Sequence, residues 1–424
     1  MKEYLKKLPQ GLQDLICLAG EISAATDNKV YLVGGFVRDL ILGVKNFDLD
    51  IVVEGDGIKF AEELATRLKV KLIRHKRFGT ATLVLDHSLK IDIATAREEC
   101  YPTPACLPLV KSGSVKDDLK RRDFSINAMS VSLNPHDYGK LVDFFHGLDD
   151  LCHREIRILH DLSFIDDPTR ILRAIRFEQR FDFKIEPKTL KLLKVAVKLK
   201  ALQKVQPQRL RDELILMLKE VHPIKQIKRM QQLVGLNFIH PHLKIGKNNY
   251  LLLKSVEREV SWFKKNCSLR RHPDVWLIYF MAILDHFSVD SVKTIFNGFV
   301  FRRGEEKRIL DYKKINPKFI KHLKNRQAKP SKIFSLLNPL SYEAIILIKA
   351  KYKAKFIAKH IDDFFKIYHS LRIHITGSDL LRQGFSAGPF FKEIFTKVLV
   401  AKLDGIVQTK EEELIFIRKL AKIK

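Results

Sequence analysis

The chain has 424 residues, of which 46% are hydrophobic and 30% are charged, and its formal net charge is +28. This composition indicates a folded globular protein with more than one core and excludes a disordered chain. No apolar run reaches the roughly eighteen residues of a membrane span, so we expect no membrane contact. Five scattered cysteines without a Cys-x-x-Cys pair argue against a disulfide framework or a thiolate zinc site and indicate a reducing cytoplasm.

The charge is distributed unevenly. Residues 1–150 hold 21 basic and 22 acidic residues, whereas residues 151–424 hold 56 basic and 27 acidic residues. This asymmetry indicates chemistry in the first third and binding of a polyanion, most often nucleic acid, in the remainder. The alternative is a solvated, lysine-rich helical surface.

The first third mixes strand and helix patterns, which predicts an α+β domain. The spacing of IKFAEELATRLK predicts a helix between two strands. Short β-branched or aromatic stretches separated by turn residues predict strands in VYLVGG, FDLDIVV, VKLIRH, TATLVLDHSLKIDIAT and LVDFFHG.

From about residue 158 apolar residues recur every three or four positions, which predicts an all-helical remainder. The pattern is clearest in TLKLLKVAVKLKAL, RLRDELILMLKE, VWLIYFMAILDHF and FIAKHIDDFFKIYHSL. Prolines and a lysine-rich stretch predict the joints, which are Pro207, Pro223 and residues 313–332 with Pro317 and Pro330.

The stretch YLVGGFVRDLILGVKNFDLDIVVEGDG places a glycine pair and two aspartates at opposite ends of one short apolar unit. Gly34 and Gly35 allow a tight turn whose N–H groups approach a triphosphate, and a short helix with Arg38 follows. Asp48 and Asp50 share one face of a strand, where two carboxylates repel each other unless a cation lies between them. Mg²⁺ takes such oxygen ligands and shares them with phosphates.

Each half of this unit also has an ordinary interpretation. Asp-x-Asp is common at strand ends, and Gly-Gly can be a plain turn. A dinucleotide-binding fingerprint needs Gly-x-Gly-x-x-Gly, which the stretch lacks. The combination of both halves favours a phosphate turn joined to a metal site.

A third carboxylate comes from Asp92. If residues 80–96 form a hairpin that turns at residues 86–88, Asp92 faces away from Ile91 and Ile93. An acid in an apolar strand is then placed to ligate metal or to accept the proton of an attacking hydroxyl. A solvated, outward-facing Asp92 is the equally weighted alternative.

The segment DLKRRDFSINAMSVSL contains an Arg-Arg-Asp motif followed by a strand or a partly buried helix. Arg121 and Arg122 offer forked donors to phosphate oxygens, and Asp123 can accept from ribose hydroxyls. Asn127, four residues on, is a further candidate nucleotide-binding residue. The alternative is a surface cluster of salt bridges.

The segment FIDDPTRILRAIRFEQRF predicts a helix with Asp167 as its N-cap and Pro168 as its first residue. A basic stripe within an arc of about 60° lies opposite an apolar one. The basic residues are Arg173, Arg176 and Arg180, and the apolar residues are Ile171, Leu172 and Ile175. The stripe is either an amphipathic surface or, through Arg173 and Arg176, part of the nucleotide site.

Asp167 and Arg170 are the residue types needed to read a base from the protein side. Adenine and cytosine both present an exocyclic amino donor beside a ring-nitrogen acceptor, whereas uracil and guanine reverse this pattern. One carboxylate and one guanidinium, three residues apart near a helix start, match adenine and cytosine. A plain capping role for Asp167 is the alternative.

Taken together, these motifs resemble those of the class II tRNA nucleotidyltransferase and bacterial poly(A) polymerase family. The resemblance rests on the order and spacing of four motifs and on a similar C-terminal segment. The motifs are LVGGFVRDLILG…FDLD, DLKRRDFSINAM, DDPTRILRAIRFEQRF and QRLRDEL, and the C-terminal segment is ITGSDLLRQGF…LDGIVQTKEEEL. The resemblance implies a polymerase-β-like catalytic head followed by helical neck, body and tail domains. We expect these at residues 1–157, 158–222, 223–360 and 361–424.

The resemblance also implies roles. The family's metal aspartates fall on Asp48 and Asp50, its phosphate-turn glycines on Gly34 and Gly35, its Arg-Arg-Asp motif on residues 121–123, and its base-reading pair on Asp167 and Arg170. A neck motif, usually Glu-Arg-x-x-x-Glu, matches at Arg209 and Glu213. Gln208 and Asp166 stand where the family more often has Glu.

The implied reaction is template-independent, Mg²⁺-dependent addition of the 3′-terminal nucleotides of tRNA from ATP and CTP, with release of pyrophosphate. The Tyr-Pro-x-Pro pattern at Tyr101 is similar to the subgroup that adds only the terminal A, so both A and CCA addition stay open. A poly(A) polymerase and a non-catalytic RNA-binding protein are the alternatives.

Overall fold

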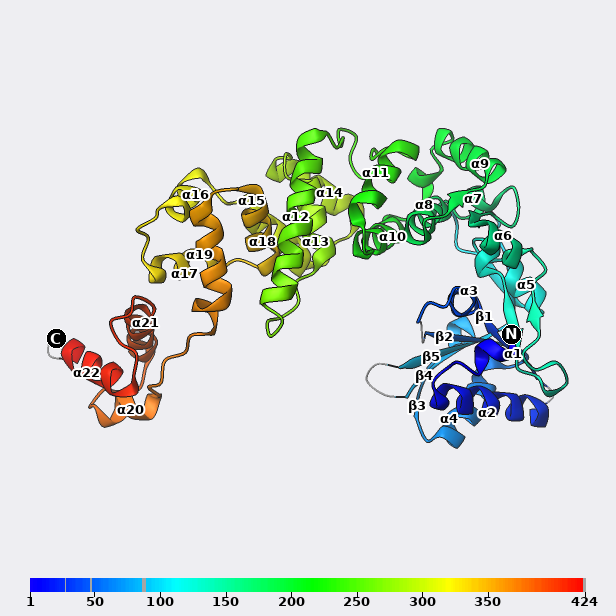
Figure 1. Cartoon of the computed structure of the whole chain (residues 1–424), viewed down its shortest axis with the longest axis horizontal. Helices are drawn as coiled ribbons and strands as arrows, with labels where there is room; N and C mark the ends of the chain where they lie inside the picture. The colour runs from blue at the N-terminus through cyan, green and yellow to red at the C-terminus, as the bar shows by residue number, and fades with distance from the viewer. Residues whose placement is uncertain (27, 46–47, 86–88, 422–424) are drawn as a thin grey trace. The chain divides into compact units, whose positions relative to one another are not determined.

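The computed structural model describes residues 1–26, 28–45, 48–85 and 89–421. Contacts divide the chain into two compact units, Met1–Phe238 and Ile239–Lys424. Within the described part, all strands belong to the first unit, and the second is built from helices (Figure 1). The finer boundaries at residues 157, 222 and 360 stay a prediction.

The first unit is built on a seven-stranded mixed sheet with the order β3-β4-β5-β2-β1-β8-β9, in which only β2 and β5 run parallel. This confirms the α+β prediction. The strands are β1 (Lys29–Val33), β2 (Leu49–Glu54), β3 (Lys71–His75), β4 (Thr80–Val84), β5 (Lys90–Thr95), β8 (Ser130–Ser132) and β9 (Leu141–Val142), and a separate hairpin joins β6 (Arg97–Cys100) and β7 (Leu109–Ser112).

The expected hairpin of residues 80–96 is present as β4 and β5, which pair antiparallel; the turn expected at residues 86–88 lies outside the described residues. The segment after the Arg-Arg-Asp motif forms the 3₁₀ helix η2 (Ser125–Asn127) and then β8, so it combines the two predicted alternatives.

Helices cover the sheet and set the direction of its side chains. The helix α4 (Gly57–Leu68) packs on β2, β3, β4 and β5, and the Asp56 carboxylate caps it by accepting from the N–H groups of Ile58 and Lys59. Val52 of β2 packs with Leu119 of α5 (Val115–Lys120). Because Asp50 shares the face of Val52, the residues that follow α5 lie over Asp50. The other helices of this part are α1 (Lys2–Leu5), α2 (Gln10–Thr26), α3 (Gly35–Ile41) and α6 (Gly147–His153), with the 3₁₀ helices η1 (Lys76–Phe78) and η3 (Pro135–Asp137).

The rest of the first unit is helical apart from a two-residue strand, β11 (Lys184–Ile185), which pairs parallel with β10 (Glu155–Ile156). The predicted apolar stripe is buried, because α8 packs against α10 and α11. Pro207 and Pro223 each stand at a helix start, where a missing N–H costs nothing. The helices are α7 (Ser163–Asp166), α8 (Thr169–Phe181), α9 (Pro187–Lys198), α10 (Pro207–Lys219) and α11 (Pro223–Leu233), with the 3₁₀ helix η4 (Ala201–Lys204).

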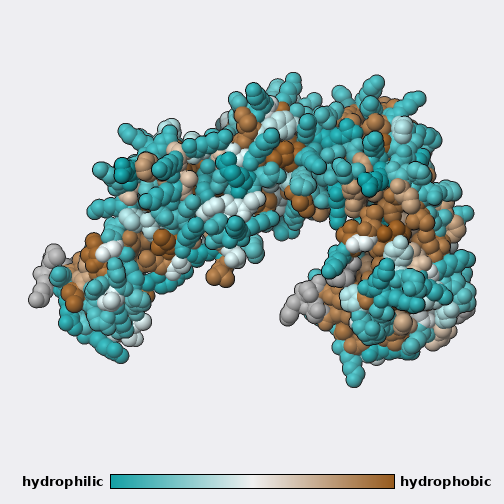
Figure 2. Space-filling view, in the orientation of Figure 1, coloured by the Kyte–Doolittle hydropathy of each residue, from teal (hydrophilic) through white to brown (hydrophobic). Residues whose placement is uncertain are grey.

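The second unit centres on α13 and α18. Every residue of α13 after Val275 is buried, and so is most of α18. Its helices are α12 (Lys247–Asn266), α13 (Val275–Ile283), α14 (Val289–Phe299), α15 (Arg303–Lys313), α16 (Pro317–Lys324), α17 (Pro330–Leu337), α18 (Tyr342–Lys351), α19 (Lys355–Lys366), α20 (Gly377–Arg382), α21 (Pro389–Leu403) and α22 (Lys410–Ala421), with the 3₁₀ helix η5 (Tyr368–Ser370). Hydrophilic side chains cover most of the face of this unit that Figure 2 shows.

No single helix in the described part of the chain is long and apolar enough to cross a membrane. One pair, α17 with α18, meets that test of length and composition only when both are taken together, and the two are bent by 114°.

Candidate active site

The glycine pair ends β1. Gly34 adopts a φ of +71°, which favours glycine, and Gly35 begins α3. A Cβ on Gly34 would stand 2.2 Å from Nη1 of Arg122. Gly35 lines the main cavity of this unit, while the bare backbone of Gly34 leaves room for the Arg122 guanidinium.

The two aspartates of the Asp-x-Asp motif also line the main cavity. Asp50 is the second residue of β2, and Asp48 directly precedes the strand, which therefore begins one residue later than the motif suggested. Burial raises the pKa of Asp50 to about 6; Arg122 opposes this effect, and the carboxylates of Asp48 and Asp92 add to it. Asp50 therefore lies in a place where negative charge is incompletely balanced.

This imbalance is what a divalent cation would relieve. Among the described residues, no group of three His, Cys, Asp or Glu side chains is arranged to hold a metal ion by itself. Mg²⁺ is commonly bound by one or two carboxylates and completes its octahedron with water and phosphate oxygens. The pair Asp48 and Asp50 fits such an ion.

Asp92 lies beside Asp50. The two residues are direct partners in the parallel pairing of β2 and β5, so their side chains share one face of the sheet. The Thr82 hydroxyl, on the neighbouring strand β4, donates to Oδ1 of Asp92 at 2.6 Å. Asp92 lines a second cavity that adjoins the main one at Asp50. Its role in catalysis stays a prediction.

The Arg-Arg-Asp motif follows α5 and is held by a buried carboxylate. Asp118 has no exposed side-chain surface and forms ion pairs with Arg121 at 2.7 Å and Arg122 at 3.0 Å. Arg121 also contacts Glu99 at 3.2 Å. Asp118 thereby fixes both guanidinium groups at the wall of the cavity.

Asp123 is buried, and its oxygens accept from protein donors: Oδ1 from Asn127 and Oδ2 from Arg173, at 2.9 and 2.8 Å. Burial alone would raise the pKa of Asp123, but Arg173 and the Asn127 hydrogen bond outweigh it and hold the pKa at about 2. Asn127 in turn accepts from Arg38. The predicted contact of Asp123 with a ribose stays a prediction; the structure shows it orienting Arg173 and, through Asn127, Arg38.

Asp167 and Arg170 line the same cavity. The helix α8 begins at Thr169, so the helix starts one position after the predicted Pro168, yet Asp167 still accepts from the Thr169 N–H at 3.1 Å. Arg209 forms an ion pair with Asp167 at 2.8 Å. Arg170 is buried and donates to the Ser163 hydroxyl and to the Arg121 carbonyl at 2.6 and 2.7 Å.

The basic stripe of α8 is not a solvated surface. Glu213 of α10 forms ion pairs with Arg173 and Arg176 at 3.0 and 3.4 Å, and Glu220 lies 3.6 Å from Arg176. The Arg176 guanidinium also lies 4.7 Å from the centre of the Phe177 ring. Both predicted arginines line the cavity, held in place by the neighbouring helix.

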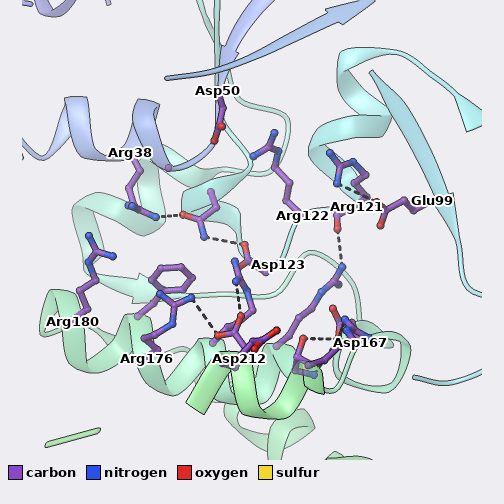
Figure 3. A pocket seen from close by; sticks show the side chains of 18 of the residues that line it. Arg38, Asp50, Glu99, Arg121, Arg122, Asp123, Asp167, Arg176, Arg180 and Asp212 are labelled. Atoms are coloured by element: carbon purple, nitrogen blue, oxygen red, sulfur yellow. Dashed lines mark hydrogen bonds and ion pairs between the residues drawn. The ribbon is translucent and has the colours of Figure 1, made fainter. Parts of the chain in front are cut away.

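The main cavity has a volume of about 660 Å³, which suits a nucleotide. Figure 3 shows Asp50 with Arg122 beside it, and Arg176 and Arg180 on α8 across the cavity. Sequence reasoning did not assign several of the lining residues to the site. Among them, Phe177, Arg180 and Asp212 lie inside recognised motifs, and Glu99 and Tyr101 come from β6 and the position after it.

Two protein-family models match parts of this chain. Residues 30–157 match the family described as "Poly A polymerase head domain". Residues 182–245 match the family described as "Probable RNA and SrmB- binding site of polymerase A".

Curated relatives match along most of the chain. The A-adding tRNA nucleotidyltransferase of Geobacter sulfurreducens is 37% identical over 98% of this chain and 48% of its own length. The A-adding tRNA nucleotidyltransferase of Halalkalibacterium halodurans is 33% identical over 94% of this chain and 90% of its own length. The chain thus spans about half of the first relative and nearly all of the second.

Solved structures show the same fold. A CCA-adding enzyme in its apo form II matches with a TM-score of 0.77 at 38% identity and covers 99% of this chain and 98% of its own. The Thermotoga maritima CCA-adding enzyme complexed with tRNA matches with a TM-score of 0.72 at 36% identity and covers 100% and 98%. With these sequence and structural matches, the chain belongs to the class II tRNA nucleotidyltransferase and bacterial poly(A) polymerase family.

Proposed function

We propose that this protein adds the 3′-terminal nucleotide or nucleotides of tRNA, either A or CCA, from ATP and CTP without a template. The observation that carries the proposal is the pairing of Asp50 with Asp92 beside a cavity walled by Arg121, Arg122 and Arg170. Solved CCA-adding enzymes of this fold complexed with tRNA, with ATP and with CTP support it.

In the proposed reaction the 3′-hydroxyl oxygen of the RNA attacks the α-phosphorus of the nucleotide. The bond from that phosphorus to the oxygen of the β-phosphate breaks, and pyrophosphate leaves with the electron pair. Asp92 accepts the hydroxyl proton, and Arg122 and Arg121 hold phosphate oxygens. We assign Mg²⁺ to Asp48 and Asp50; when bound, it neutralises charge on the phosphates. The protein contributes mainly position and charge.

Base selection falls to Asp167 and Arg170. Their carboxylate and guanidinium complement the amino donor and ring-nitrogen acceptor that ATP and CTP share. Arg209 and Ser163 contact the two side chains at 2.8 and 2.6 Å, so the reading groups are held before a nucleotide arrives. This pre-organisation favours selection without a nucleic-acid template.

The remaining domains hold the RNA in this proposal. We place catalysis in residues 1–157, base selection in 158–222 and tRNA binding in 223–360 and 361–424, where most of the excess positive charge lies. We also place the protein in the cytoplasm, consistent with five free thiols.

A primer-extension gel tests the proposal. Purified protein is given tRNA transcripts that end before, within or after CC, together with ATP, CTP or both. One added A on a CC end identifies a tRNA nucleotidyltransferase. Growth from the discriminator base with both nucleotides then identifies CCA addition, and its absence identifies an enzyme that adds only A. A long ladder of A residues would instead identify a poly(A) polymerase, and no extension at all would contradict the proposal.

A further inference from the structure

The head contains a second cavity of about 400 Å³ that adjoins the main one. The two cavities share Asp50, Arg121 and Arg122. Nucleotidyl transfer joins two substrates at one phosphorus atom, and the attacking and leaving oxygens lie in line on its opposite sides. Two cavities that meet at a catalytic carboxylate have the layout such a reaction needs.

The floor of the second cavity comes from the edge of the sheet. Thr82 pairs with Asp92 across β4 and β5, and His75 pairs with Thr80 across β3 and β4. Residues two apart in a strand share a face, so Thr80 and Thr82 lie on the face that carries Asp92, and all four residues line the cavity. Two hydroxyls and an imidazole therefore extend from the catalytic carboxylates along the sheet.

The chemistry of this lining differs from that of the main cavity. Among its described lining residues, Arg121 and Arg122 at the shared wall are the only arginines, and there is no lysine. The rest consists of the carboxylates Asp50 and Asp92, the two threonines, His75, and small or apolar residues. Beyond the two arginines at the shared wall, a triphosphate would meet two carboxylates and no further cation among the described lining residues. A ribose and base instead offer hydroxyls and ring atoms that threonine and histidine can bind.

We propose that this second cavity is the acceptor subsite, in which His75, Thr80 and Thr82 bind the 3′-terminal nucleoside of the RNA and place its 3′-hydroxyl beside Asp92. The inference rests on the proposed function and adds the residues that hold the second substrate. Thr82 has two parts in it: it lines the subsite and donates to Asp92 at 2.6 Å. The main cavity holds the incoming nucleotide.

The first test pairs protein and RNA changes. The variant His75→Ala/Thr80→Val is assayed with ATP on tRNA ending in CC, and kcat/KM for the RNA is expected to fall about tenfold from the loss of two hydrogen bonds, with the equilibrium Kd for ATP unchanged. Wild-type protein is assayed on RNA whose last residue is 2′-deoxycytidine or an abasic ribose, both of which keep the 3′-hydroxyl. The variant protein is also assayed on the altered RNAs. If the contact is direct, the fold-loss in kcat/KM of the variant on an altered RNA is smaller than the product of the two separate fold-losses.

The matched control is Arg74→Ala. Arg74 precedes His75 on β3 but points to the other face and pairs with Glu62 at 2.6 Å. The substitution Arg74→Ala removes more positive charge than His75→Ala, yet the kcat/KM of this variant for the RNA is expected to stay within twofold of wild type. Thermal unfolding checks that each variant folds; should the double variant not fold, Thr80→Val alone, with Thr80→Ser as rescue, replaces it.

The second test needs no turnover. A tRNA whose last residue is 5-iodocytidine is irradiated on the wild-type protein, and the crosslinked peptide is identified by mass spectrometry. A crosslink within residues 71–84 supports the subsite. The subsite is overturned by a crosslink found only elsewhere, or by an unchanged kcat/KM in the variant. It is also overturned if the fold-losses of variant and RNA multiply fully with both RNAs, or if the variant binds ATP more weakly. Absence of nucleotide addition by wild-type protein would instead count against the proposed function, and the crosslink would still decide the subsite.

Discussion

Asp50 of β2 and Asp92 of β5 are direct partners across the parallel pairing of their strands. The pairing sets two carboxylates on one face, beside Arg122 and the preceding Asp48. Their mutual repulsion is what a cation bound between them would relieve.

The raised pKa of Asp50, about 6, predicts how pH and stability are linked. A carboxyl whose folded pKa lies above its unfolded value stabilises the fold most at low pH, and this contribution is lost as pH rises through about 6. Asp50→Asn has no carboxyl to ionise, so the variant does not lose this stability as pH rises. At pH 7.5 without divalent ions we expect the variant to unfold with a free energy about 2 kcal/mol higher than wild type, measured by urea denaturation.

The difference is expected to shrink as pH is lowered from 7.5 to 4, where wild-type Asp50 is protonated. Added Mg²⁺ should raise the thermal midpoint of wild type but not of Asp50→Asn. Asp149→Asn, at an exposed carboxylate of the head, serves as the control. A variant less stable than wild type at pH 7.5 would contradict this interpretation of Asp50.

Gly34 and Gly43 offer a matched pair of backbone substitutions. Both have a positive φ, +71° and +68°, but a Cβ on Gly34 would meet Arg122 while a Cβ on Gly43 meets nothing within 4 Å. Gly34→Ala and Gly43→Ala should therefore lose similar stability from the backbone. Only Gly34→Ala is expected to displace Arg122, lowering kcat/KM for ATP at least tenfold and moving the acid limb of the pH profile to higher pH.

The direction of that movement follows from charge. Arg122 lowers the pKa of Asp50, so its displacement lets the pKa rise further. Equal activity of the two alanine variants would show that Gly34 serves only the turn.

Some of the site followed from sequence and some did not. Gly34, Asp48 and Asp50 lie within one short unit, so local chemistry was enough to join them. Whether Asp92 faced them depended on the register between β2 and β5, a long-range pairing that a local pattern does not encode.

The arginines of α8 show the same limit. A helical wheel placed Arg173 and Arg176 on one stripe, and both line the cavity. Their partner Glu213 comes from α10, and Tyr101 approaches from the end of β6. Motifs had drawn attention to Glu213 and Tyr101, but their approach to this cavity is set by packing between elements, which no period within one element reveals.

Asp123 predicts a stability effect of the opposite sign to Asp50. Its pKa is held at about 2, so the ionised carboxylate stabilises the fold above its unfolded pKa, and this contribution is lost as pH falls toward 2. Asp123→Asn leaves Arg173 without one of its two buried partners. We expect a loss of about 3 kcal/mol at pH 7, measured by urea denaturation and much reduced at pH 3; an unchanged midpoint at pH 7 would refute it.

Arg170 predicts a change in nucleotide choice. Arg170→Ala removes the guanidinium assigned to the base and should reduce the preference for ATP and CTP over UTP and GTP by at least tenfold, because one good bidentate contact accounts for about 1–3 kcal/mol of discrimination. Arg180→Ala is the control, since Arg180 lines the same cavity and its loss removes the same charge. Competition assays with all four nucleotides measure the ratio. Equal loss of selectivity in both variants would indicate a general charge effect.

The central claim, that Asp48 and Asp50 hold the metal for nucleotidyl transfer to tRNA, is tested most directly with Asp48→Ala. Incorporation of radiolabelled AMP into tRNA ending in CC and equilibrium tRNA binding are measured on the same preparation. The account predicts at least a thousandfold loss of incorporation with tRNA affinity within twofold of wild type. Incorporation at the wild-type rate would contradict it.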